Sequence, residues 1–115
     1  MASIGAVQVR TREARCGTRV ACNIPVVLAS SNSIRWSSEP GVVILANPQG
    51  CGVKCSRPVE IGTVLLLDGL PTAKMVSARV VNCFSVAEKL WIIGLALEHP
   101  GNVWGIENPP ENWSK

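Results

Sequence analysis

The sequence has no long apolar segment, because none of its hydrophobic runs approaches the ~18 residues that a membrane-spanning helix requires. The N-terminus also lacks the continuous apolar stretch of a secretory signal peptide. We therefore expect a cytoplasmic protein without membrane insertion, in which the five cysteines stay reduced. The odd number of cysteines also argues against a disulfide framework.

Residues that would support catalysis or metal binding are scarce. The single histidine, His99, has no serine or cysteine motif for which it would act as a base, and the eight acidic residues are scattered singly. No glycine-rich loop precedes a helical pattern. Only Cys51 and Cys55 have the spacing of zinc ligands, whereas five residues separate Cys16 from Cys22. We expect neither enzymatic activity nor a cofactor nor a metal.

Helical patterns are scarce too, and apolar and β-branched residues arrive in short runs divided by glycine, proline, asparagine and serine. This rhythm predicts an all-β domain, a small six-stranded antiparallel β-barrel in which consecutive strands pair. Closing the sheet removes the exposed edges that such apolar strands would otherwise present. Turns are expected at residues 47–50 and 68–71. The expected strands are Ile24–Ser30, Gly41–Ala46, Gly52–Ser56, Thr63–Asp68, Ala73–Phe84 and Lys89–Glu98.

The chain divides into three parts by pattern. Residues 1–19 show neither strand nor helix periodicity and are expected to form a mobile basic arm. Residues 20–99 form the barrel. The prolines of residues 100–115 preclude a long helix, and we expect this tail to pack on the barrel, with Trp104 and Trp113 covering its open end.

All of the net charge of +3 lies near the N-terminus. Residues 1–23 contain one glutamate and four arginines, whereas the rest of the chain has seven basic and seven acidic groups. Guanidinium groups concentrated beside a neutral domain suit a compact anion such as a phosphate. The four arginines are Arg10, Arg12, Arg15 and Arg19.

Two motifs carry a resemblance to a known family. Arg15 and Arg19 are four residues apart and run directly into a strand pattern, and a polar turn with Asn47, Gln49 and Gly52 follows the second apolar run. This combination resembles the PilZ domain, a bacterial receptor for cyclic di-GMP, and the likeness extends over most of the chain. Gln49 departs from the family pattern, which usually has serine there. Its longer amide can either replace the hydrogen bond of the serine or obstruct the pocket.

The resemblance implies a PilZ-like barrel that binds cyclic di-GMP without catalysis. Arg15 and Arg19 would clamp the ligand, and Arg12 would add a phosphate contact. Asn47 would bond the guanine edge, and Gly52 would let the backbone approach the ligand without a Cβ. Binding would order the arm and pass the signal to a protein partner.

Other interpretations remain open at this stage. The arginines can also serve as a solvated basic arm, and Gln49 is compatible with a degenerate PilZ-type adaptor that acts only through protein contacts. A small nucleic-acid-binding barrel is less favoured, because the domain beyond the arm has no basic excess. We expect Trp91, Trp104 and Trp113 to pack in the core or as a cap rather than to stack on bases.

Overall fold

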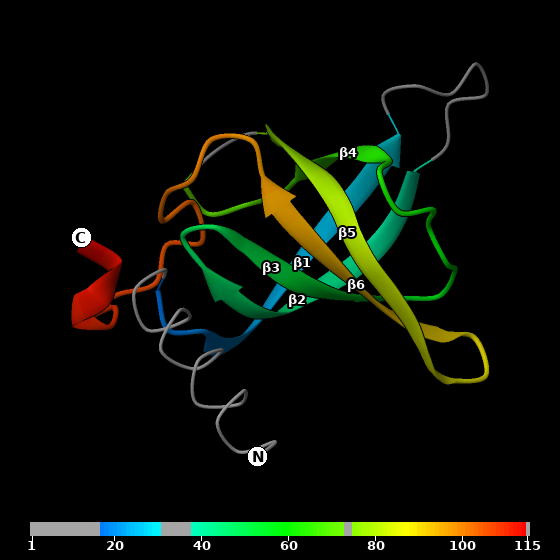
Figure 1. The fold of residues 1–115 in the computed structure, drawn as a ribbon, viewed down its shortest axis with the longest axis horizontal. Coiled ribbons are helices and arrows are strands. Elements are labelled where there is room, and N and C mark those ends of the chain that lie inside the picture. The colour runs from blue at the N-terminus through cyan, green and yellow to red at the C-terminus, as the bar shows by residue number, and fades with distance from the viewer. Residues whose placement is uncertain (1–16, 31–37, 73–74, 115) are drawn as a thin grey trace, which may run out of the picture.

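The computed structural model describes residues 17–30, 38–72 and 75–114, which form a closed antiparallel barrel of six strands followed by one 3-10 helix (Figure 1). The all-β class and the six antiparallel strands predicted from the sequence are confirmed. No helix in this part of the chain has the length and apolar character needed to cross a bilayer. The elements are β1 (Val20–Ser30), β2 (Ser38–Asn47), β3 (Gly50–Cys55), β4 (Val64–Asp68), β5 (Met75–Ala87), β6 (Leu90–Leu97) and η1 (Glu111–Ser114).

The strand order around the barrel is β1-β2-β3-β6-β5-β4. The prediction that consecutive strands pair is therefore wrong for β3 and β4. β3 pairs with β6, and β4 pairs with β1, where Val27 lies opposite Asp68. The physical reason is closure of the barrel, because these two pairings give every strand two neighbours and leave no open edge. The connection over residues 56–63 crosses between the two pairs instead of making a hairpin.

Strand ends differ from the sequence prediction where pairing continues past the apolar pattern. β5 extends beyond Phe84 to Ala87, because Ser85 still pairs with Trp91 of β6. The resulting β5–β6 hairpin projects from one end of the barrel (Figure 1). The predicted turn at residues 47–50 joins β2 to β3 at the opposite end, near the start of β1 and η1 (Figure 1).

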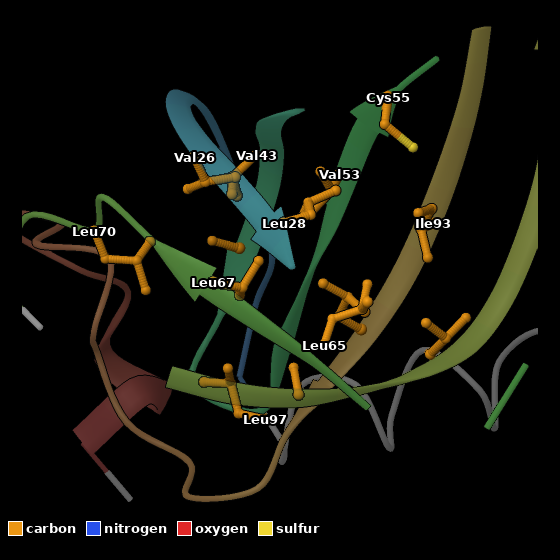
Figure 2. Close-up of a cluster of buried hydrophobic side chains, with 14 of the residues drawn as sticks. Val26, Leu28, Val43, Val53, Cys55, Leu65, Leu67, Leu70, Ile93 and Leu97 are labelled. Atoms are coloured by element: carbon orange, nitrogen blue, oxygen red, sulfur yellow. The ribbon is translucent and has the colours of Figure 1, made fainter. Parts of the chain in front are cut away.

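The core lies inside the barrel and takes side chains from all six strands. Figure 2 shows Val26, Leu28, Val43, Val53, Leu67 and Ile93 pointing into this interior. From the tail, Trp104 joins the core with only 1% of its surface exposed, and Trp113 packs against it. Trp91 is half-buried against the same cluster, whereas Trp36 lies outside the described residues.

Candidate ligand-binding site

A surface pocket of about 270 Å³ lies on the outer face of the barrel, over β2, β3, β6 and β5. It brings Arg19, which precedes β1, together with the turn that joins β2 to β3. These segments are far apart in sequence, and the antiparallel pairing of β1 with β2, in which Val20 lies opposite Ala46, makes them neighbours. The lining residues are Arg19, Leu45, Ala46, Asn47, Gln49, Gly50, Cys51, Gly52, Val81, Asn82, Phe84, Ile92, Gly94, Leu95 and Ala96.

One row of ladder partners forms the floor of the pocket. Leu45 lies opposite Gly52, Gly52 opposite Gly94, and Gly94 opposite Asn82. A Cβ built on Gly52 would meet no atom closer than 3.9 Å, whereas one on Gly94 would lie 2.3 Å from Asn82 Oδ1. Gly52 therefore leaves the backbone bare at the centre of the floor, whereas the side chain of Asn82 lies over Gly94.

Two β-bulges shape this row. One falls between Val43 and Leu45 of β2, and the other between Val80 and Asn82 of β5. A bulge inserts one residue and reverses the face that the following side chains occupy. Val43 and Val80 are fully buried, whereas Leu45 and Asn82 are exposed. The bulges thus direct the side chains of Leu45 and Asn82, at the two ends of the row, outward into the pocket.

The walls are largely apolar. Leu45, Val81 and Phe84 are exposed on this face, and Ile92 is half-buried. Of the described residues that line the pocket, none is a carboxylate, and Arg19 carries the one formal charge. An apolar, cationic hollow suits a ligand that combines a flat ring with an anionic group.

The side chain of Asn47 connects the turn to the segment that carries Arg19. Its Oδ1 accepts hydrogen bonds from the backbone N–H groups of Gln49 (2.9 Å) and Gly50 (3.0 Å). Its Nδ2 donates to the carbonyl oxygen of Gly17 at 3.0 Å. The amide is therefore engaged on both sides, so Asn47 positions the turn against the Gly17 backbone, and its contact with a guanine edge stays a prediction.

The backbone just before Arg19 is also held by the C-terminal tail. Thr18 N–H donates to Asn112 Oδ1 (3.0 Å), and Asn112 Nδ2 donates to Thr18 Oγ1 (2.8 Å). Trp113 Nε1 donates to the Thr18 carbonyl at 2.6 Å. Gly17 has a φ of 116°, and a Cβ there would lie 2.8 Å from Pro48. Arg19 is thus presented from a backbone fixed by both the turn and the tail.

Of the residues predicted from the sequence, Arg19, Asn47, Gln49 and Gly52 line the same pocket. Arg12 and Arg15 lie outside the described residues, as does most of the predicted arm. Sequence reasoning missed the lining residues that β5 and β6 contribute. A polar residue and an aromatic residue near the end of an apolar strand pattern were the available signal for two of them. Among the missed residues are Asn82, Phe84 and Gly94.

Cys51 lines the pocket but does not provide reactive chemistry there. Burial, with a smaller contribution from Cys22, raises the pKa of its thiol to about 12, so the thiol stays protonated near neutral pH. Burial also raises the pKa of Cys55. Within residues 17–30, 38–72 and 75–114, no cluster of three or more histidine, cysteine or acidic side chains could hold a metal ion.

Comparison with protein-family models, with curated proteins and with solved structures finds no match to this chain. The functional interpretation therefore rests on the two motifs and on the geometry of the pocket. The most informative part of this geometry is the pocket, where Arg19 meets the turn over residues 47–52.

Replacing Asn47 with alanine is expected to lower the free energy of unfolding by about 1–3 kcal/mol, because backbone donors in the turn lose their acceptor. Urea unfolding followed by tryptophan fluorescence measures this change. Asn23→Ala is the matched control, since Asn23 is exposed on β1 and makes no side-chain hydrogen bond to the described residues. Equal, small effects of the two substitutions would contradict the positioning role.

Proposed function

We propose that this protein is a non-catalytic receptor for cyclic di-GMP, as its resemblance to PilZ domains implies. The ligand would bind in the pocket between Arg19 and the turn over residues 47–52. The observation that carries the proposal is the meeting of these two separate motifs in one pocket that no carboxylate of the described chain lines. Neither motif alone would be specific enough to indicate a cyclic di-GMP site.

The chemistry of the lining residues suits a cyclic dinucleotide. A guanidinium group binds a phosphate through two parallel hydrogen bonds, or addresses O6 and N7 of guanine. Arg19 supplies this group at the rim, and the apolar walls offer a surface for a base. The volume of about 270 Å³ is below the roughly 300–1,000 Å³ of pockets for drug-sized ligands. The pocket therefore suits one half of the ligand, and we expect Arg12 and Arg15 to contact the other half.

The hydrogen bonds of the turn support the interpretation of Gln49 as a tolerated variant. The backbone N–H of Gln49 already donates to Asn47 Oδ1, and its carbonyl accepts from Leu97 N–H at 2.8 Å. A serine hydroxyl at this position is therefore not needed to satisfy the turn. Gln49 lines the pocket, and a side-chain amide can donate to or accept from a ligand.

The signal would pass to a protein partner in the cytoplasm. Ligand contact with Arg19 acts on the backbone of Thr18, which is bonded to Asn112 and Trp113 of the tail. A change at the pocket is thus coupled to the surface around η1. This surface is the part of the receptor that we expect a partner to read.

A second candidate function is a PilZ-type adaptor that binds protein and no nucleotide. The exposure of Val81, Phe84 and Val86 on β5 favours it, because apolar side chains grouped on one surface are typical of protein-binding sites. Titration with cyclic di-GMP separates the two functions, since an adaptor of this kind would give no heat of binding.

Arg19→Ala is expected to weaken cyclic di-GMP binding about 10- to 150-fold, the loss typical of a hydrogen-bonded charged group. Isothermal titration calorimetry of the purified full chain measures the affinity. Arg57→Ala is the matched control, because Arg57 is an exposed arginine outside the pocket lining and should leave the affinity within about twofold. Unchanged affinity in Arg19→Ala would refute the arginine clamp.

A further inference from the structure

Two side chains of β5 face the pocket without serving the proposed arginine clamp. Asn82 lies opposite Gly94 of β6, and Phe84 lies opposite Ile92. They are two residues apart on one strand and share a face of the sheet. Phe84 is the one phenylalanine of the chain, and 53% of its surface is exposed. A large aromatic side chain in this position covers no core, so its place at the pocket calls for another role.

Asn82 differs from Asn47 in what its amide already binds. The amide of Asn47 holds three backbone groups, whereas that of Asn82 makes no hydrogen bond to any residue that the structure describes. The side chain of Asn82 lies over the backbone of Gly94, with its polar atoms at the pocket floor. A donor and an acceptor are thus both presented to a ligand at this point.

Phe84 and Ile92 provide an adjacent apolar surface. Both line the pocket, from neighbouring strands and from paired positions of the ladder. Every nucleobase has a π-face that can stack on an aromatic ring, and removal of such a ring costs about 5- to 150-fold in affinity per base. An aromatic ring beside an unengaged carboxamide is an arrangement that recognises a planar ring with a polar edge.

We propose that Asn82 and Phe84, supported by Ile92, form a purine-base subsite. Phe84 stacks on the base, and Asn82 bonds its edge. The cis-amide edge of guanine is complementary to a carboxamide, because Asn82 Nδ2 can donate to O6 while Oδ1 accepts from N1–H. This inference rests on the proposed function and deepens it, since it assigns base recognition to β5 and leaves the phosphates to Arg19.

The stacking contact is tested by titrating cyclic di-GMP into the full-chain Phe84→Ala and Val86→Ala variants. Val86 is the matched control, because it is 54% exposed on the same strand but does not line the pocket. We expect Phe84→Ala to lose about 5- to 150-fold in affinity and Val86→Ala to stay within twofold. Equal affinities of the two variants would overturn the subsite and would assign the exposed surface of β5 to protein docking instead.

The edge contact is tested by comparing cyclic di-GMP with cyclic di-AMP, which has the same phosphates and sugars. Asn82→Leu should weaken cyclic di-GMP binding about 5- to 150-fold. Asn82→Asp should raise the preference for cyclic di-GMP over cyclic di-AMP, because a carboxylate only accepts and guanine offers two adjacent donors, N1–H and the N2 amino group. The added negative charge affects both ligands alike, so it cancels in the ratio. An unchanged ratio would overturn the edge contact.

The wild-type titration distinguishes failure of the subsite from failure of the proposed function. Absence of cyclic di-GMP binding by the folded wild-type chain refutes both proposals together. Wild-type binding that is weakened by Arg19→Ala but not by Phe84→Ala or Asn82→Leu refutes the base subsite alone. Thermal unfolding of each variant verifies that the fold is intact, as expected for exposed side chains of β5.

Discussion

Gly50→Ala is expected to lower the free energy of unfolding by about 3 kcal/mol or more. A Cβ at this position would lie 1.9 Å from the Leu95 carbonyl oxygen and 3.2 Å from Ala96 Cα. Both are backbone atoms of β6, so no rotamer change relieves the clash, and β3 must move away from β6. Because β3 carries the pocket floor, the same substitution should also reduce ligand binding. Urea unfolding followed by tryptophan fluorescence measures the stability change.

Gly52→Ala is the matched control, since Gly52 lies two residues further along the same strand. A Cβ there would approach no atom closer than 3.9 Å, which is ordinary contact, so the free energy of unfolding should change by no more than about 0.5 kcal/mol. If the two glycine substitutions destabilise the protein equally, the close β3–β6 approach at Gly50 is incorrect.

Trp104→Ala is expected to lower the free energy of unfolding by about 3–5 kcal/mol, the range for loss of a large buried aromatic side chain. Trp104 is 1% exposed within the core, and its Nε1 donates to the Asn47 carbonyl at 2.8 Å. The substitution therefore opens a cavity and removes a support of the turn. Differential scanning calorimetry and urea unfolding measure the loss.

Trp104→Phe separates the two contributions of this side chain. Phenylalanine keeps most of the apolar burial but cannot donate to Asn47, so the expected loss is about 1–3 kcal/mol. A loss below about 1 kcal/mol in Trp104→Ala would mean that the tail is not part of the core.

The strands and the β2–β3 turn could be predicted from the sequence because their signals are local. Apolar runs mark the strands, and Asn47 with Gly50 marks the turn. The structure gives a physical reason for both residue types, since Asn47 bonds the turn and Gly50 tolerates no Cβ. Arg19 meets this turn because it directly precedes β1, whose first residue, Val20, lies opposite Ala46 of β2.

The rest of the site depends on two bulges that have no clear sequence signal. Strict alternation would place Asn82 on the buried face together with Val80, and Leu45 together with Val43. The bulge before each residue reverses its side, so both reach the pocket. Bulges are common next to binding sites, where they redirect a side chain. Here the bulge in β5 brings Asn82, to which we assign recognition of the base, to the pocket.

Long-range pairings were the other part that the sequence could not provide. The contact of Thr18 with Asn112 and Trp113 joins residues that are 94 and 95 positions apart. No local pattern marks these partners. The pairing of β3 with β6 and of β4 with β1 likewise depends on closure of the whole barrel. The contact with the tail fixes the backbone that presents Arg19.

The most direct test of the central claim is isothermal titration of the purified wild-type chain with cyclic di-GMP, with GTP as the control ligand. We predict micromolar or tighter binding of cyclic di-GMP and no comparable binding of GTP, because the pocket suits one half of the cyclic dinucleotide and GTP lacks the second half, which we expect Arg12 and Arg15 to contact. Absence of binding heat from folded protein, or equal binding of GTP, would contradict a cyclic di-GMP receptor.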